Sequence, residues 1–150
     1  EFLPGIGAYI EVQLGALNCP FVLNQFTIES ITPTAAGHDL TFSYGLGTGS
    51  NALLLYAFDE DPIGWTLSLL PGTPTIFVGA PATDMSTWFH RSLAPQALTA
   101  ASTGCIETTL TVPAAVPSGT TVYFQVLAVP SPVTMVDPWR SSIVRNFVQP

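Results

Sequence analysis

Charge is the scarcest property of this 150-residue sequence. Asp, Glu, Lys and Arg together make up 9% of it, whereas a typical soluble domain has about 25%. Lysine is absent, and the basic residues are limited to Arg91, Arg140 and Arg145, which leaves a formal net charge of −7. Nucleic acids and anionic membrane surfaces attract clustered Lys and Arg, so neither is an expected partner of this chain.

Long apolar runs are also missing. The longest, Ala52–Phe58, is far shorter than the roughly 20 residues that a membrane-spanning helix needs, so we expect no membrane span. The opening stretch "EFLPGIGAYI" has no basic residue before its apolar part, unlike a signal peptide, and Glu1 is typical of a mature end left by processing. The sequence therefore predicts an extracellular protein, secreted or located at the cell surface.

Cysteine occurs only twice, as Cys19 and Cys105, with no CxxC motif and no histidine close by in the sequence. This spacing argues against a zinc site, and we expect neither a metal nor a cofactor. In a secreted protein the two residues are candidates for a disulfide. It would close a loop of about 86 residues and add roughly 4.5 kcal/mol of stability on the chain-entropy account. The alternative is two buried free thiols.

Apolar and polar residues alternate along most of the chain, which is the pattern of half-buried strands. Three segments show it clearly, "AYIEVQLGAL" (8–17), "LTFSYGL" (40–46) and "CIETTLTV" (105–112). Two further strands are predicted in "TTVYFQVLAV" (120–129) and "SSIVRNFV" (141–148). The first of these two is apolar on both faces, as in a central strand.

Proline and glycine clusters separate the strands, at 31–39, 45–51, 59–64, 69–75, 112–120 and 129–133. Frequent turns without a convincing helix predict an all-β fold. We expect one domain over residues 1–150, a single antiparallel β-sandwich of about eight or nine strands, immunoglobulin-like or jelly-roll-like. The segment least like a strand is 82–101, where Thr83 or Asp84 can cap a helical turn and Pro95 limits its length.

The C-terminal two-thirds of the chain shows a familiar order of segments, "LLPGTPTIFVGAP", "GCIETTLTVPAAVPSGTTVYFQVLAV" and "SSIVRNFVQP". They contain a Gly-Cys strand, a Pro-rich turn, a V-Y-x-Q-V strand and a closing S-x-x-V-R strand. In this they resemble the small secreted low-charge β-sandwich domains of planctomycete and related bacterial extracellular proteins. The resemblance implies the fold and secretion, and it implies no catalytic residue.

Three consecutive acids, Asp59, Glu60 and Asp61, follow the apolar run. Asp59 and Asp61 have the alternating spacing of calcium ligands, but the stretch does not continue as a calcium loop, and Pro62 followed by Gly64 favours a β-turn. We expect a solvent-facing turn here. Calcium binding is the alternative.

Catalytic motifs are lacking as well. The sequence contains two histidines, His38 and His90, no GxSxG elbow, and no pair of acids that stands out among ten in the way that a glycosidase requires. Each histidine is expected to be a surface or hydrogen-bonded residue. The chain is therefore not expected to be an enzyme.

Three tryptophans, Trp65, Trp88 and Trp139, are candidates for a sugar-stacking platform. Aromatic side chains form good binding surfaces, but they are equally common in cores and interfaces. A secreted carbohydrate-binding or adhesive module, with a glycan as its partner, is therefore the alternative function.

The scarcity of charge favours self-assembly instead. Soluble monomers normally carry a mixed, charged surface, whereas neutral outward faces of Thr, Ser, Ala and Val suit burial by further copies of the chain. Residues 1–17 are a possible strand-exchange segment that can add to an open sheet edge of the next copy, through Tyr9, Ile10, Val12 and Leu14. Repeated head to tail, such a contact gives a fibre or tube.

The sequence thus predicts a structural subunit of an extracellular filament, tube or surface layer that assembles with copies of itself. The alternative for the first strand is that it pairs within its own sandwich.

Overall fold

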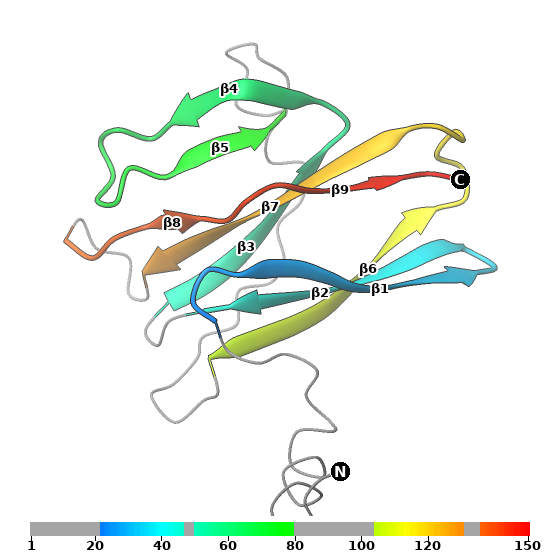
Figure 1. The fold of residues 1–150 in the computed structure, drawn as a ribbon, viewed down its shortest axis with the longest axis horizontal. Helices are drawn as coiled ribbons and strands as arrows, with labels where there is room; N and C mark the ends of the chain where they lie inside the picture. The colour runs from blue at the N-terminus through cyan, green and yellow to red at the C-terminus, as the bar shows by residue number, and fades with distance from the viewer. Residues whose placement is uncertain (1–21, 47–49, 80–103, 131–135) are drawn as a thin grey trace, which may run out of the picture.

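The computed structural model describes residues 22–46, 50–79, 104–130 and 136–150. Within these ranges the chain forms nine β-strands and no helix, and every strand pair is antiparallel. The all-β prediction and the predicted strand number are confirmed (Figure 1). The strands are β1 Phe26–Thr34, β2 Gly37–Gly45, β3 Ser50–Ala57, β4 Glu60–Thr66, β5 Thr75–Val78, β6 Cys105–Pro113, β7 Thr121–Pro130, β8 Arg140–Ser141 and β9 Arg145–Val148.

Two main sheets form the sandwich. The first has the strand order β1-β2-β6, and in the second β7 pairs with β3 on one edge and with β8 and β9 on the other. Figure 1 shows the first sheet in the lower part of the view, the second above it, and the β4–β5 pair at the top.

The main core lies between the two sheets, and the predicted alternation of β2 produces it. Leu40, Phe42, Tyr44 and Leu46 are all buried, as their spacing predicted. The Phe42 ring lies 5.5 Å from the Phe26 ring and 4.8 Å from the Phe124 ring, measured between centroids. Phe42 therefore contacts the aromatic residues of both sheets.

A second, smaller core lies on the opposite face of the second sheet, where the β4–β5 pair covers it. It consists of Leu55, Ile76, Leu127 and Val129. This extra layer explains why β7 is apolar on both faces: its alternate side chains enter two different cores. The prediction that β7 is a central strand is confirmed.

Gln125 is the polar exception on β7, and it is fully buried. Its Oε1 accepts a hydrogen bond from the Phe77 backbone N–H at 2.9 Å, and its Nε2 donates to the carbonyl oxygens of Thr75 and Ser142, both at 2.9 Å. The side-chain amide of Gln125 thus forms hydrogen bonds with the backbone of β5, as a neighbouring strand would. It ties the third layer to the second sheet.

The segment 31–39, predicted as a Pro/Gly-rich turn, is instead most of a hairpin. β1 and β2 pair as far as Thr34 opposite Gly37, so the connection shrinks to two residues. Pro33 is tolerated because β1 is an edge strand, where an N–H is not needed on the free side. Gly37 has a φ of 144°, and a Cβ there would lie 2.0 Å from the Val112 carbonyl oxygen.

The segment 141–148, predicted as one strand, is interrupted. β8 pairs Ser141 with Leu127, whereas β9 pairs Arg145 with Phe124, so the register shifts by one residue between them. Ser142 causes the interruption, because its Oγ accepts the Val126 N–H at 2.9 Å in place of a backbone carbonyl. The result is a local bulge.

The predicted strand at 8–17 and the predicted helical turn at 82–101 lie outside the described residues. No helix within the described ranges is long and apolar enough to cross a membrane.

Candidate assembly groove

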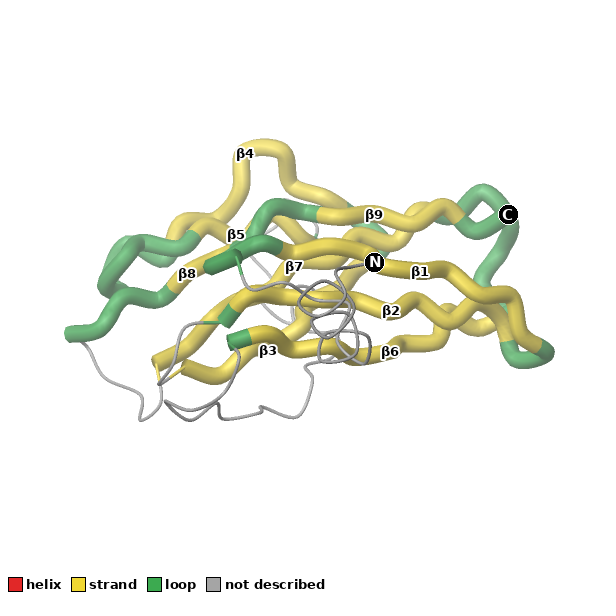
Figure 2. Tube along the Cα trace, turned by 60° about the horizontal axis from the view of Figure 1, so that its bottom comes forward, coloured by secondary structure: helices red, strands yellow, loops and turns green. Residues whose placement is uncertain are grey.

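The two long borders of the sandwich differ, and one of them is closed. At this border β9 lies next to β1 (Figure 2). The Arg145 Nε donates to the Phe26 carbonyl oxygen at 2.8 Å, and the Asn24 Nδ2 donates to the Ser141 carbonyl oxygen at 3.0 Å. Side chains therefore bridge the two sheets where no strand does.

Tyr44 completes the closed border. Its hydroxyl donates to the Asn24 Oδ1 at 2.7 Å, which orients the amide that bridges to Ser141. Burial raises the pKa of Tyr44 well above its usual value, and the positive charge of Arg140 opposes this only in part. The neutral phenol is therefore the form that the fold stabilises.

The opposite border is open. β6 ends the first sheet and β3 ends the second, and among the described residues no strand pairs with the outer edge of either. The two strands run in the same direction. Ala52 near the start of β3 lines the same pocket as Ile106 near the start of β6, and Phe58 just after β3 lines the same pocket as Val112 near the end of β6. We call the space between them the β3–β6 groove, lined by Ala52, Leu54, Tyr56 and Phe58 on one side and Ile106, Thr108, Leu110 and Val112 on the other.

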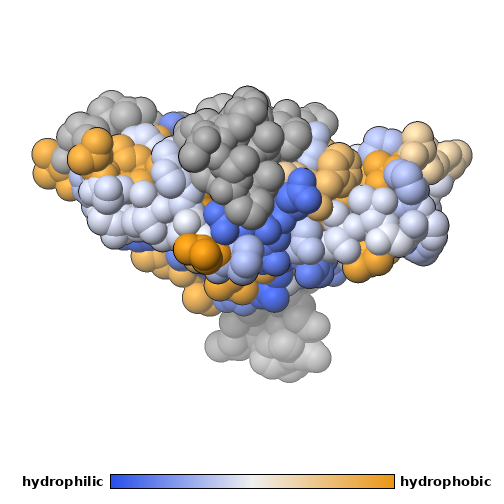
Figure 3. Space-filling view, turned by 90° about the horizontal axis from the view of Figure 1, so that it is seen from above, coloured by the Kyte–Doolittle hydropathy of each residue, from blue (hydrophilic) through white to orange (hydrophobic). Residues whose placement is uncertain are grey.

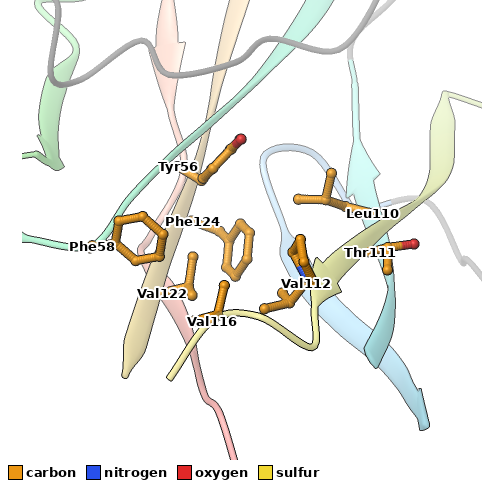
Figure 4. A pocket seen from close by; sticks show the side chains of 9 residues that line it. Tyr56, Phe58, Leu110, Thr111, Val112, Val116, Val122 and Phe124 are labelled. Carbon is orange, nitrogen blue, oxygen red and sulfur yellow. The ribbon is translucent and has the colours of Figure 1, made fainter. Parts of the chain in front are cut away.

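The groove has most of its room at the end where β3 and β6 finish, here called the far end. The pocket there has a volume of about 260 Å³, and its floor contains Val116, Val122 and Phe124 (Figure 4). At the near end, beside Ala52 and Ile106, the free volume is only about 20 Å³. A 150 Å³ apolar cavity holds a benzene molecule, so the far end has room for a large apolar side chain.

The chemistry of the groove is apolar. None of the side chains that line the far-end pocket is charged, and its polar groups are the hydroxyls of Tyr56 and Thr111. Phe58 is 50% exposed, and Tyr56 and Val116 are half-buried against the main core. The remaining apolar lining residues, among them Leu110, Val112 and Phe124, are buried. An apolar border on which the described residues place no further strand suits an added β-strand rather than a polar substrate or an ion.

The near end of the groove is also where the described chain begins. The Asn24 N–H donates to the Gly45 carbonyl oxygen at 2.8 Å, and Gly45 pairs with Cys105, the first residue of β6. Among the described residues there is no free cysteine. Five further predicted site residues lie outside the described residues: Tyr9, Ile10, Val12, Leu14 and Cys19.

The tryptophans do not form an exposed platform in the described part of the chain. Trp65 and Trp139 are both partly buried and pack against the smaller core. They therefore lie on the same side of the second sheet, where they cover this core. Trp139 also borders a shallow hollow of about 570 Å³ next to Arg140. Trp88 lies outside the described residues.

The acidic stretch was predicted to be a solvent-facing turn, and Asp59 and Glu60 are indeed exposed, but Asp61 is buried and the last two residues belong to a strand instead of a turn. Glu60 and Asp61 begin β4, and Asp61 is buried, with its Oδ1 accepting the Ile63 N–H at 3.1 Å. The pairing of β4 with β5 shifts register between Glu60 and Trp65, which makes room for Pro62 and for Gly64, whose φ is 81°. Asp59 is exposed.

Metal-ligating side chains do not converge in the described ranges: no three of His, Cys, Asp and Glu form a group that could hold an ion. His38 is half-buried, with its ring 5.5 Å from the Phe147 ring. His90 lies outside the described residues.

The outer face of the first sheet is rich in hydroxyl groups and acidic, since it carries Asp39, Glu107 and Glu29, whose carboxylate accepts a hydrogen bond from the Ser43 hydroxyl. The hydroxyls of Thr41 and Thr109 lie 3.1 Å apart across β2 and β6, and the Thr111 hydroxyl donates to the Asp39 carboxylate at 2.7 Å. On the face shown in Figure 3, apolar surface occurs in separate groups between polar and neutral residues. Ile63 and Leu69 on the β4–β5 pair are 87% and 89% exposed.

Sequence comparisons add nothing to this geometry. The chain matches no protein-family model, no curated protein and no solved structure. The resemblance to planctomycete-type extracellular domains therefore stays a prediction.

Proposed function

We propose that the protein is a structural subunit of an extracellular filament, tube or surface layer, and that copies assemble by adding the N-terminal strand of one to the β3–β6 groove of the next. The observation that carries this proposal is the asymmetry of the sandwich. One border is closed by side-chain bridges, whereas at the other the described residues place no further strand beside β3 or β6, whose side chains line an apolar pocket.

The proposed donor matches the groove in length. β3 has 8 residues and β6 has 9, and the alternating part of the N-terminal segment runs from Ala8 to Ala16. At about 3.3 Å per residue, such a strand reaches from one end of the groove to the other. Its ladder hydrogen bonds would form along the outer edge of β3 or β6 while its apolar face contacts the groove.

The donor also matches the groove in pattern. One face of the segment is apolar, with Ile10, Val12 and Leu14 between two alanines, and the other presents Tyr9, Glu11, Gln13 and Gly15. The groove accepts apolar residues and contains no charged lining residue at its far end.

A Cys19–Cys105 disulfide would fix the base of the donor strand. Cys19 precedes Val22 by three residues, which span at most about 10 Å. Val22 contacts Gly45, the strand partner of Cys105, so the two sulfurs can meet at the near end. The bond would keep the segment attached to the end of the subunit from which it leaves.

The groove can be tested without disturbing the core, because Phe58 is half exposed. We expect Phe58→Asp to prevent assembly, since a carboxylate would have to be buried under the added strand. Ile63→Asp is the matched control, because it introduces the same charge at an exposed apolar residue outside the groove. Both variants should keep the parent's circular dichroism spectrum.

Negative-stain microscopy and light scattering give the readout. The proposal predicts assemblies from the parent and from Ile63→Asp, and monomers from a folded Phe58→Asp. Equal assembly of all three proteins would refute the role of the groove.

A second candidate function is a carbohydrate-binding or adhesive module. The observation in its favour is the shallow hollow of about 570 Å³ that Trp139 and Arg140 border. It predicts a monomer that binds glycans, with binding weakened by Arg140→Ala. A glycan array with the parent and this variant distinguishes the two functions.

A further inference from the structure

We infer that copies of this chain also meet end to end, with Asp59 and Glu60 of one copy seated in the hollow beside Arg140 of the next. Asp59 and Glu60 are called the acidic tip below. This inference rests on the proposed function and adds a charged contact between copies to it. The contact is the same for either direction of the added strand.

Arg140 is a cation without a partner in the described part of the chain. Of the two arginines there, Arg145 donates to the Phe26 carbonyl oxygen, whereas Arg140 forms no hydrogen bond and no ion pair with a described residue. It is half-buried beside the closed border, where its positive charge acts on the neutral Tyr44 hydroxyl. A guanidinium presents five N–H donors in a fork that fits a carboxylate, so Arg140 suits an acid from outside its own subunit.

The hollow that Arg140 borders lies at the near end of the subunit. Arg140 pairs with Ala128, the strand partner of Ala52, which marks that end. The hollow has a volume of about 570 Å³, and it is lined by Thr75 of β5 and by Ser141 of β8. Arg140 is the only charged residue among the described residues that line it. The hollow therefore favours a negatively charged occupant.

The acidic tip lies at the opposite end. It follows Phe58, which lines the far-end pocket, where the chain passes from β3 to β4 (Figure 1). Both side chains are exposed, and neither carboxylate has a hydrogen bond or an ion pair within the described ranges. Asp39 and Glu29, in contrast, accept hydrogen bonds from hydroxyl groups on their own sheet face. The acids of the tip are therefore available to a second copy.

The tip and the hollow lie at the same level across the layers of the fold. The tip connects the second sheet to the β4–β5 pair, and residues of the same two parts line the hollow. Seven residue steps separate Ala52 from Asp59, which is about 23 Å along the strand axis. Because the two surfaces differ and lie at opposite ends, the contact is heterologous, and its repetition gives an open fibre or a ring.

The charge of the chain makes this contact selective. With a net charge of −7, copies repel one another wherever like charges meet. At the end-to-end contact opposite charges meet instead, and water screens them less in a partly buried hollow than on an open surface. The contact also brings Val22, which packs against Gly45 at the near end, to the far end of the neighbouring copy. The N-terminal segment precedes Val22, so it starts beside the neighbour's groove.

Charge reversal in the 150-residue chain tests the contact. One variant carries Arg140→Glu, and the tip variant carries Asp59→Arg with Glu60→Arg. We expect each variant alone to raise the concentration needed for assembly roughly tenfold, because the contact then joins like charges. The tip variant has a smaller net negative charge than the parent, so a general relief of repulsion would lower this concentration instead.

An equimolar mixture of the two variants shows whether the contact joins different copies. The parent tip of one variant then meets the parent hollow of the other, and the two reversed surfaces match as well. We expect the mixture to assemble at about the parent's concentration, measured by light scattering and checked by negative-stain microscopy. The control carries Glu29→Arg with Glu107→Arg on the outer face of the first sheet, which changes the net charge as much as the tip variant does, and it should not restore Arg140→Glu.

Several results would overturn the inference: assembly of either variant at the parent's concentration, a mixture no better than its components, or equal restoration by the control. Circular dichroism checks that each variant is folded. If Arg140→Glu does not fold, Arg140→Gln takes its place, and adding the tip substitutions to it should have no further effect; a further loss as large as in the parent would overturn the inference. Parent assemblies beside any of these contrary results leave the structural function standing, and a parent that forms no assemblies removes both.

Discussion

Gln125 offers the sharpest test of how the layers of this fold are joined. Its side chain is fully buried and forms three hydrogen bonds, to the Phe77 N–H and to the carbonyl oxygens of Thr75 and Ser142. The perturbation is Gln125→Met, which keeps the size of the side chain and removes all three bonds. Exposed Gln25 provides the control, Gln25→Met.

The expected cost follows from the groups that lose their partner. A buried donor or acceptor without a partner costs about 1–3 kcal/mol, and Gln125→Met leaves one N–H and two carbonyl oxygens in this state. Carbonyl oxygens tolerate partial satisfaction better than N–H groups, so we expect a loss of about 3–6 kcal/mol in the free energy of unfolding. This is a large part of the 5–15 kcal/mol that stabilises a typical domain.

Urea unfolding followed by circular dichroism measures the loss, and hydrogen exchange locates it. Exchange should become faster first in β4 and β5, because Gln125 ties this pair to β7. Gln125→Glu should in addition be more stable at low pH than at neutral pH, since burial raises the pKa of a carboxyl and stability is lost as the pH rises through it. A change below about 1 kcal/mol for Gln125→Met, equal to that of the Gln25→Met control, would refute the reasoning.

Three further predictions concern the near end of the groove and the closed border. Burial raises the pKa of Tyr44, so the stability that this residue contributes is complete below pH 10 and is lost as the pH rises further. Tyr44→Phe should therefore reduce the fall of the unfolding free energy above pH 10. The same variant should cost about 1 kcal/mol of stability at neutral pH, because it removes the hydrogen bond to Asn24. Gly45→Ala should destabilise the fold and displace Val22, because the new methyl group would lie 1.8 Å from the Val22 carbonyl oxygen; unchanged melting would contradict this. Reduction should lower the unfolding free energy by about 4.5 kcal/mol if Cys19 and Cys105 are paired, whereas two thiols that react with iodoacetamide in the denatured, unreduced protein would exclude the bond.

Much of the sandwich could be predicted from local patterns. The alternation of Leu40 to Leu46 predicted an inward face that the structure confirms, and the apolar run 120–129 predicted a central strand. These predictions succeed because a strand buried on one face has alternating apolar and polar residues, and a strand buried on both faces has a continuous apolar run. The loop after β6 and the turn between β4 and β5 were likewise predicted from their proline and glycine content.

The errors occurred where a side chain or an edge position overrides the local signal. Pro33 and Pro62 indicated turns, but both lie in strands that pair on one side only among the described residues, and an N–H that points to the other side is not needed there. The interruption between β8 and β9 depends on Ser142 replacing a backbone acceptor for Val126. Sequence patterns do not show which strand lies at the edge of a sheet. They also do not show which hydroxyl accepts a backbone N–H in place of a carbonyl oxygen.

The groove itself was not predictable from the sequence, although its proposed occupant was. Phe58 and Val116 belong to loops next to β3 and β6, and nothing in their local sequence distinguishes them from core residues. They meet because β3 and β6 are the outermost described strands of two different sheets on the same border of the sandwich. The signal that was available was the N-terminal alternation of Ile10, Val12 and Leu14, a strand pattern that needs a partner edge.

The most direct test of the central claim is the state of the 150-residue chain in solution. Negative-stain microscopy and light scattering at neutral pH, without reductant, should show regular filaments or tubes, and assembly should disappear in a folded Phe58→Asp variant. A homogeneous monomer of 150 residues under these conditions would contradict a structural role and would favour the glycan-binding alternative.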